Sequence, residues 1–193
     1  MTERIGVFGG TFDPPHIAHL ALAAQARHQL GLDRVLFVVA NVPWQKASAR
    51  QISDPDDRYE MVRDAVAGRT GLEASRMEID RGGESYTADT LAELASPGRE
   101  LFLLIGSDLV SALATWKRWE ELPPLSTLAI VTRPGGFAVA QPAPQWRWVE
   151  VRMPALEISS SELRAMVGEG RPIDFLVPDS VAAHVRRRSL YRW

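Results

Sequence analysis

The sequence predicts an α/β protein built on a Rossmann-like, doubly wound parallel sheet flanked by helices. Two observations lead to this prediction. Short apolar segments rich in β-branched residues alternate along the chain with longer segments of helical spacing. Polar or glycine-containing segments directly follow three of the apolar segments, as ligand-binding loops do at the carboxyl ends of parallel strands. No repeat, low-complexity tract or linker divides the 193 residues, so we expect one domain spanning residues 1–193.

The first half of the chain carries clear start and stop signals. Gly31 follows the first helical segment as a typical C-cap, and Asp54 with Pro55 forms a typical helix start. Polar residues such as Glu73 interrupt the third apolar segment, which favours an edge strand. The expected strands are residues 4–8, 35–40 and 72–79, and the expected helices are residues 17–30 and 54–66.

The second half contains the most apolar segment of the chain, Leu-Phe-Leu-Leu-Ile at residues 101–105, which we expect at the centre of the sheet. Further strands are expected at residues 128–132 and 147–152, separated by a loop at residues 134–145 that contains proline and glycine. Helices are expected at residues 87–95, 159–167 and 180–188, with shorter helical stretches at residues 107–113 and 116–122.

Composition excludes several classes of protein. The formal net charge is −2, so bulk electrostatics do not favour a nucleic-acid partner. The three arginines at residues 186–188 are interpreted as complementing a helix dipole rather than as a nucleic-acid patch. No apolar run is long enough to span a membrane, no signal peptide is recognisable, and no cysteine is present. We expect a cytoplasmic protein without a membrane partner, and a homo-oligomer is compatible with the sequence.

The first chemical motif is the segment Gly9-Gly10-Thr11-Phe12-Asp13-Pro14-Pro15-His16-Ile17-Ala18-His19, which follows the first expected strand. Two glycines let backbone N–H groups approach a phosphate, and the helix start adds its positive dipole end. His16 and His19 lie on one side of the first helical turn and could stabilise charge on a phosphoryl group. A tight turn with two surface histidines and a histidine metal site are the alternatives. Neither a P-loop nor a dinucleotide-binding glycine motif is present.

The second motif is Ile158-Ser159-Ser160-Ser161-Glu162-Leu163-Arg164. Ser159 and Glu162 have the spacing of a capping box, which is a sufficient structural explanation. Hydroxyl groups at a helix start, with Arg164 one turn inside, would also suit the β- and γ-phosphates of ATP.

Together the two motifs resemble the nucleotidyltransferase superfamily with the His/Thr-x-Gly-His signature, although Ala18 stands where that signature has Gly. Class I aminoacyl-tRNA synthetases share the signature, but this chain is too short for one. The middle segments, Ser85-Tyr86-Thr87-Ala88-Asp89-Thr90-Leu91, Ile105-Gly106-Ser107-Asp108 and the block from Trp116 to Leu122, resemble bacterial nicotinate-mononucleotide adenylyltransferases.

The resemblance implies a role for each matching residue. The catalytic residues would be His16, His19, Lys46 and Arg164. ATP would be bound by Gly9, Gly10, Thr11, Phe12, Gly106, Asp108, Arg133, Ile158, Ser159 and Ser160. The pyridine substrate would be bound by Trp44, Tyr86, Thr87, Trp116 and Lys117.

The reaction that the resemblance implies is an attack by the 5′-phosphate of nicotinate mononucleotide on the α-phosphate of ATP, with release of pyrophosphate. The attacking oxygen is already anionic, so the protein would mainly position the substrates and neutralise charge. Mg²⁺ is expected to bridge the ATP phosphates and to keep mostly water ligands, with no protein-built metal site. The alternatives are a sister transferase acting on nicotinamide mononucleotide or a phosphopantetheine-type substrate, and a nucleotide-binding sensor without catalysis.

Overall fold

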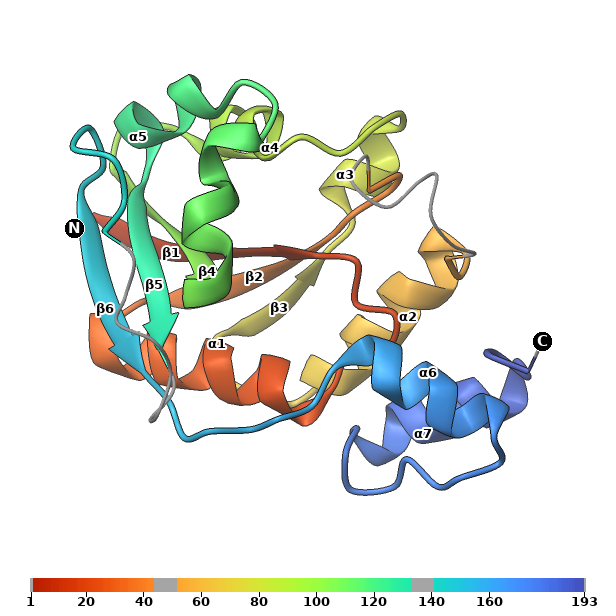
Figure 1. The fold of residues 1–193 in the computed structure, drawn as a ribbon. Coiled ribbons are helices and arrows are strands. Elements are labelled where there is room, and N and C mark those ends of the chain that lie inside the picture. The colour runs from red at the N-terminus through yellow and green to blue at the C-terminus, as the bar shows by residue number, and fades with distance from the viewer. Residues whose placement is uncertain (1, 44–51, 133–140, 193) are drawn as a thin grey trace.

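A six-stranded parallel sheet in the order β3-β2-β1-β4-β5-β6 forms the centre of the protein (Figure 1). The computed structural model describes residues 2–43, 52–132 and 141–192. The strands are β1 (Glu3–Gly10), β2 (Arg34–Val39), β3 (Leu72–Ser75), β4 (Arg99–Gly106), β5 (Thr127–Thr132) and β6 (Trp148–Arg152). The α-helices are α1 (Ile17–Leu30), α2 (Pro55–Val66), α3 (Met77–Arg81), α4 (Thr87–Leu94), α5 (Leu122–Leu125), α6 (Ser160–Gly168) and α7 (Asp179–Arg187), and the 3-10 helices are η1 (Ser107–Thr115) and η2 (Trp119–Glu121).

This architecture confirms the predicted Rossmann-like fold class. The strand order reverses between β1 and β4, which lie side by side in the middle of the sheet, so the most apolar strand is central as expected. A crevice forms at such a switch point, beyond the carboxyl ends of the two strands. None of the described helices combines the length and the apolar character that crossing a bilayer requires.

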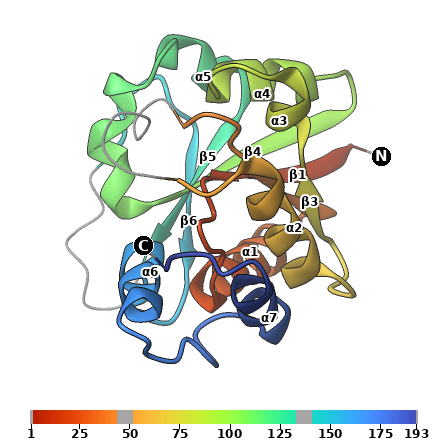
Figure 2. The ribbon, with the colours of Figure 1, turned by 90° about the vertical axis from the view of Figure 1, so that its right-hand side faces the viewer.

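Alternation of side chains along β1 divides the core between the two faces of the sheet. Phe8 points into one hydrophobic cluster with residues of α1 and α2, whereas Ile5 and Val7 point into a second cluster with residues of α4, η1 and α5. Figure 2 shows the corresponding layers, with α1 and α2 on one side of the sheet and α3, α4 and α5 on the other. A third cluster packs α6 and α7 against Met61 and Ala65 of α2.

Capping residues explain the helix boundaries that the sequence predicts well. Gly31 ends α1 in the left-handed conformation, with φ 58°, and its N–H bonds the carbonyls of Arg27 and His28. The Asp54 side chain accepts from the Asp56 N–H at the start of α2. Because these caps act locally, both helices have the predicted ends.

The prediction of one strand over residues 72–79 is wrong in its second half. The chain leaves the edge strand after Ser75 and forms the short helix α3, in which Arg76 and Asp80 pair one turn apart. The predicted helical stretch over residues 116–122 is also revised. Trp116 ends η1, Arg118 has a φ of 57°, and helical structure begins again at Trp119.

Candidate active site

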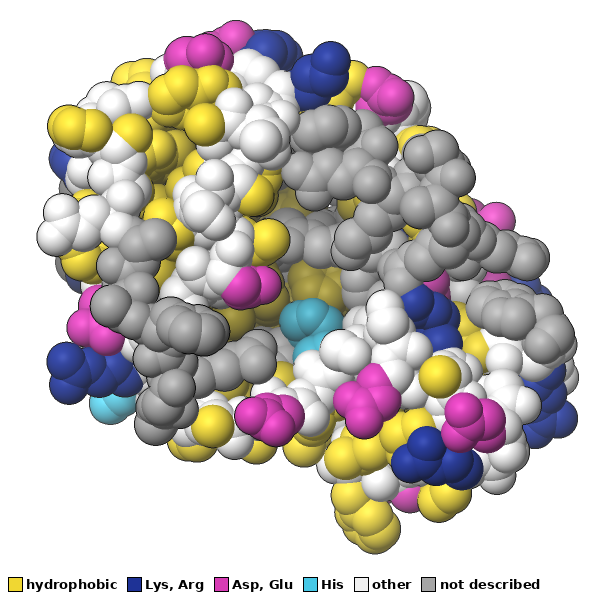
Figure 3. Space-filling model, viewed as in Figure 1, with side chains coloured by type: hydrophobic (Ala, Val, Ile, Leu, Met, Phe, Trp, Pro, Cys, Tyr) yellow, Lys and Arg dark blue, Asp and Glu magenta, His cyan; other side chains and the backbone are white. Residues whose placement is uncertain are grey.

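A pocket of about 260 Å³ opens beyond the carboxyl ends of β1 and β4, at the switch point of the sheet. Its lining joins predicted residues that are far apart in the sequence: Gly9, Gly10, Thr11, Tyr86, Thr87, Gly106, Trp116 and Lys117. Figure 3 shows that this face of the molecule is hollowed, with a histidine side chain at the bottom of the hollow. The pocket therefore joins the glycine loop to the predicted pyridine-binding residues, whereas the two histidines and the start of α6 are not among the residues that line it.

The two glycines that end β1 leave room for different groups, Gly9 for the pocket and Gly10 for the Phe12 ring. A Cβ atom on Gly9 would meet no protein atom within 4 Å, so a side chain there would enter the pocket. A Cβ atom on Gly10 would lie 2.8 Å from the Phe12 ring. Phe12 itself is buried in the core and packs edge-on against His19, with ring centroids 5.1 Å apart. Phe12 therefore offers its backbone, rather than its ring, to a nucleotide.

His16 and His19 fix each other at the start of α1. Their rings are stacked with centroids 3.6 Å apart. They also form a reciprocal capping box, in which each side chain accepts from the backbone N–H of the other. The His19 acceptor is Nδ1, 3.2 Å from the His16 backbone nitrogen, so Nε2 carries the ring hydrogen of a neutral His19. The histidine pair thus holds a defined donor at the phosphate loop.

The second motif is tied directly to the first. The Ser160 hydroxyl donates to the Pro14 carbonyl (2.9 Å), and the Arg164 guanidinium donates to the Asp13 carbonyl (2.7 Å). Ser159 is the N-cap of α6 and accepts from the Glu162 N–H, as the spacing predicts. These contacts join segments almost 150 residues apart, so α6 presents its first turn beside the histidine loop. Ile158 packs partly against the third cluster.

The opposite wall of the pocket comes from the start of α4 and from η1. Tyr86 is the N-cap residue of α4 and makes no side-chain capping bond, so the helix start is available to an anionic group. Thr87, Trp116 and Lys117 line the same wall. The indole Nε1 of Trp116 is buried and has no hydrogen-bond partner among the described residues. Asp108, at the first turn of η1, is exposed and lies over Gly106.

Three predicted site residues, Trp44, Lys46 and Arg133, lie outside the described residues. Their assigned roles stay predictions.

Sequence reasoning missed a buried arginine that organises the loops behind the pocket. Arg58 is 1% exposed, and its guanidinium donates to backbone carbonyls of Thr11, Ala40, Asn41 and Ser53 at 2.6–3.0 Å. Burial lowers the pKa of Arg58. Four carbonyl partners satisfy most of its donors and fix the chain ends that leave β1 and β2. The signal was its helical spacing from the buried residues Met61, Val62 and Ala65, which places a cation on an apolar face.

A second missed residue is Glu78 on α3, which lines the pocket and is 7% exposed. It accepts a hydrogen bond from the Thr90 hydroxyl (2.5 Å) and interacts with the Ser85 hydroxyl. Burial raises the pKa of Glu78, and these two hydroxyls only partly offset that effect. No usable signal marks Glu78 in the sequence, because the pattern over residues 72–79 predicts an edge strand.

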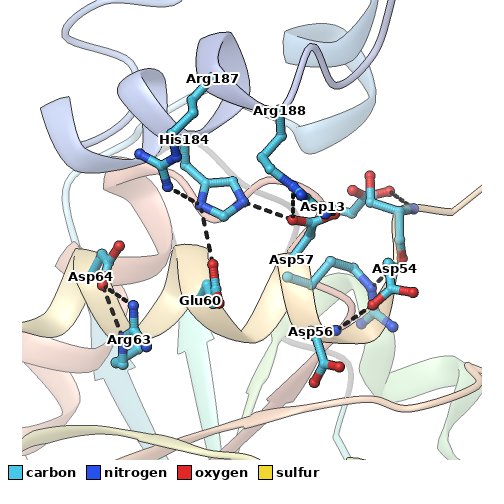
Figure 4. A network of polar contacts seen from close by, with 12 residues as sticks. Asp13, Asp54, Asp56, Asp57, Glu60, Arg63, Asp64, His184, Arg187 and Arg188 are labelled. Carbon is cyan, nitrogen blue, oxygen red and sulfur yellow. Dashed lines mark hydrogen bonds and ion pairs between the residues drawn. The ribbon is translucent and has the colours of Figure 1, made fainter.

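The described residues contain one group with the composition of a metal site, Asp57, Glu60 and His184, and it lies between α2 and α7 (Figure 4). His184 contacts Asp57 through Nε2 (3.0 Å) and the Arg187 guanidinium through Nδ1 (3.1 Å). A guanidinium can only donate, so Nδ1 accepts and Nε2 donates to the carboxylate. Both ring nitrogens are thus used, Arg188 also binds Asp57, and the group does not fit a metal ion.

Comparison with known proteins identifies the family to which this chain belongs. The family model described as cytidylyltransferase-like matches residues 7–166. The chain therefore belongs to the cytidylyltransferase-like family, which confirms the resemblance to nucleotidyltransferases.

Two curated relatives are similar to this chain over almost its whole length. A protein of Saccharopolyspora erythraea named "Probable nicotinate-nucleotide adenylyltransferase" is 41% identical over 98% of this chain and 90% of its own length. A protein of Frankia alni with the same name is 44% identical over 95% of this chain and 98% of its own. Among solved structures, the nicotinic acid mononucleotide adenylyltransferase of Plasmodium falciparum complexed with NaAD has a TM-score of 0.78. It is 18% identical, with 98% of this chain and 97% of that chain covered, and so supports the fold.

Proposed function

We infer that this protein is a nicotinate-nucleotide adenylyltransferase, which transfers the AMP moiety of ATP to nicotinate mononucleotide in NAD biosynthesis. The products are deamido-NAD and pyrophosphate. The observation that carries this function is the single pocket in which Gly9 and Gly10 at the end of β1 face Tyr86, Thr87 and Trp116. Relatives of about 40% identity over nearly the whole chain carry the same name.

In the mechanism, a 5′-phosphate oxygen of nicotinate mononucleotide attacks the α-phosphorus of ATP. A new P–O–P linkage forms while the bond between the α-phosphorus and the oxygen bridging to the β-phosphate breaks, and pyrophosphate leaves with that bond's electrons. No proton has to be removed from the attacking oxygen, because it is already ionised. Catalysis therefore rests on alignment and on the stabilisation of charge at the α-phosphate.

We assign the stacked histidines to the charge that develops at the α-phosphate. His19 accepts through Nδ1 from the loop, so its Nε2–H would be the donor to a phosphate oxygen. We assign His16 the same role from the first turn of α1. Ser159, Ser160 and Arg164 at the start of α6 are assigned to the departing pyrophosphate, together with Lys46.

We propose that Mg²⁺ accompanies the ATP phosphates and retains mostly water ligands. Asp13, the carboxylate within the histidine loop, is fully buried and already accepts from the Tyr191 hydroxyl (2.8 Å) and the Ser53 N–H (3.4 Å). The donor set at the loop is therefore suited to phosphate oxygens rather than to a protein-built cation site. The ion would neutralise phosphate charge, and this chain's residues would orient the nucleotide.

The first test replaces the donor of His19. We expect His19→Ala to lower kcat by about 10²–10³, the usual cost of losing one such stabilising group. Because the ring also caps α1, His19→Asn serves as a second variant, whose side-chain oxygen can accept from the loop while the distal donor is lost. His28→Ala is the matched control, since His28 is exposed at the other end of the same helix.

The measurement is pyrophosphate release from ATP, Mg²⁺ and nicotinate mononucleotide, with nicotinamide mononucleotide in a parallel reaction. Activity above roughly a tenth of wild type in His19→Asn would contradict the role of His19. Faster turnover of nicotinamide mononucleotide than of nicotinate mononucleotide would contradict the substrate assignment. Binding of ATP without pyrophosphate release would indicate a nucleotide-binding sensor.

A further inference from the structure

The pocket contains a buried carboxyl group that the adenylyl transfer itself does not require. Glu78 is the acidic residue among the described lining residues, and it reaches the pocket from α3. Its hydrogen-bond partners are neutral, since Thr90 and Ser85 contact it through their hydroxyls. The charges of Arg81 and Asp89 also act on its pKa, and they do so in opposite directions. A carboxyl group in such a position needs an explanation, because burial without a directly bound cation is unfavourable.

The hydroxyl partners of Glu78 bracket the start of α4. Ser85 precedes the N-cap residue Tyr86, and Thr90 lies one turn inside the helix. One carboxyl group therefore holds both sides of the segment that carries Tyr86 and Thr87 into the pocket. Glu78, Ser85 and Thr90 all line the pocket, so these contacts orient the segment from within the pocket wall itself.

Ser85 extends the connection to the sheet. Its hydroxyl oxygen accepts from the Asn41 backbone N–H (2.8 Å), and its own N–H donates to the Val42 carbonyl (3.0 Å). Asn41 and Val42 follow directly after β2, at the edge of the pocket. These contacts run from Glu78 on α3 through Ser85 to the loop after β2. They therefore fix the position of the start of α4 relative to the sheet.

We propose that Glu78 is a positioning residue for the pyridine substrate: it sets the start of α4 so that the backbone at residues 86–87 meets the ring substituent of nicotinate mononucleotide. The proposal rests on the proposed function and deepens it. Displacement of a binding group by about 1 Å is enough to weaken a substrate contact strongly. The phosphate loop is held through its Pro14 and Thr11 carbonyls by Ser160 of α6 and by Arg58, so we expect ATP binding to depend much less on Glu78.

The test compares Glu78→Ala with Glu78→Gln. Alanine removes both hydroxyl contacts, whereas glutamine is nearly isosteric and can exchange hydrogen bonds with two hydroxyl groups. We expect Glu78→Ala to raise the KM for nicotinate mononucleotide about tenfold or more, with the KM for ATP and kcat within about twofold of wild type. Glu78→Gln should return the KM for nicotinate mononucleotide to within about threefold of wild type.

Two further variants sharpen the result. Thr90→Val removes one of the two hydroxyl contacts from a residue that is 1% exposed, and we expect an intermediate rise in the same KM. Asp80→Ala is the matched control, because Asp80 is an exposed carboxylate on α3 that pairs with Arg76 and does not line the pocket. It should leave both KM values unchanged.

Wild-type turnover of nicotinate mononucleotide tests the function, and the variants test only the positioning role. The positioning role is overturned if Glu78→Ala raises the KM values for ATP and nicotinate mononucleotide equally. It is also overturned if glutamine is as harmful as alanine, which would mean that the charge acts directly. If Glu78→Ala does not fold, Thr90→Val and Glu78→Gln decide: an unchanged KM for nicotinate mononucleotide in Thr90→Val, or a tenfold rise in Glu78→Gln, overturns it as well.

Discussion

Two carboxyl groups of this protein, Asp57 and Glu78, are equally buried, at 7% exposure each, yet their surroundings are opposite. Asp57 lies between α2 and α7, away from the pocket, among His184 and Arg188 (Figure 4). Glu78 lies at the pocket and has the hydroxyl groups of Thr90 and Ser85 as hydrogen-bond partners. The fold thus gives one carboxyl group charged hydrogen-bond partners and the other neutral ones.

The pKa values follow these partners. Burial alone would raise the pKa of Asp57, but hydrogen bonds from Arg188 and His184 outweigh it, and the pKa lies below the usual range. At Glu78 burial also raises the pKa, and the hydroxyls of Thr90 and Ser85 do not reverse it.

The different partners and pKa shifts of Asp57 and Glu78 distinguish a carboxyl group with a structural role from one with a candidate functional role. Asp57 is ionised and joins the C-terminal helix to α2, as expected for a carboxylate that stabilises a fold. Glu78 lies beside a ligand pocket, where burial raises its pKa, which is typical of positions where function rather than stability governs the residue. Substitutions at the two sites should therefore have different consequences.

The largest stability effect is expected at Asp57. Asp57→Asn removes the charge that Arg188 and the fully buried His184 share, and we expect a loss of about 2 kcal/mol, the scale of a charged hydrogen bond. For a chain of this size, Tm should fall by roughly 4–8 °C. Thermal unfolding at pH 7 measures it, with the exposed Asp56→Asn as control.

The KM for nicotinate mononucleotide distinguishes the role of Asp57 from that of Glu78. At a temperature where Asp57→Asn is folded, its KM for nicotinate mononucleotide should equal that of wild type. A raised KM with an unchanged Tm would reverse the roles given to Asp57 and Glu78.

A smaller effect is expected at Tyr191, which links the C-terminal segment to the phosphate loop. Its hydroxyl donates to the buried Asp13 carboxylate at 2.8 Å, and Asp13 also carries the carbonyl that Arg164 binds. Tyr191→Phe should cost about 1.5 kcal/mol and lower Tm by roughly 3–6 °C. The KM for nicotinate mononucleotide should change by less than about twofold, because this contact lies behind the histidines and not at α4. A tenfold rise would show that the C-terminal segment also governs the pyridine wall.

The sequence predicts the features that depend on local signals. The fold class, the caps of α1 and α2 and the N-cap Ser159 follow from residue types at fixed spacing, and the structure confirms them. The pocket's glycines and the residues Tyr86, Thr87 and Trp116 were also identified, because they lie in recognisable motifs.

Contacts between distant segments explain what was missed. Glu78 was assigned to a strand because the run from Leu72 to Ile79 has strand-like composition, while the turn into α3 depends on tertiary packing. The contact between Asp57 and His184 joins residues 127 positions apart, and nothing local marks either partner. Helical spacing does mark Arg58 as a cation on an apolar face, but its carbonyl partners lie on three other segments, and no local pattern identifies them.

The smallest predicted effect is the pH dependence of stability, in which the two carboxyl groups should act with opposite sign. The pKa of Asp57 is lowered in the folded state, so its contribution is present above the ordinary pKa of about 3.9 and is lost as pH falls through the folded value. The pKa of Glu78 is raised, so its contribution is present below about 4.3 and is lost as pH rises through the folded value.

Glutamine mimics the protonated form of Glu78 at every pH. The Tm of Glu78→Gln should therefore be close to that of wild type near pH 4 and should exceed it increasingly towards pH 7. For Asp57→Asn the deficit relative to wild type should shrink as pH falls. Thermal unfolding from pH 4 to pH 8 measures both differences, with Asp80→Asn as the exposed control. The opposite result would be a wild-type Tm that rises relative to the Tm of Glu78→Gln as pH increases. It would show that a cation stabilises the Glu78 carboxylate, and the contrast between the two sites would then disappear.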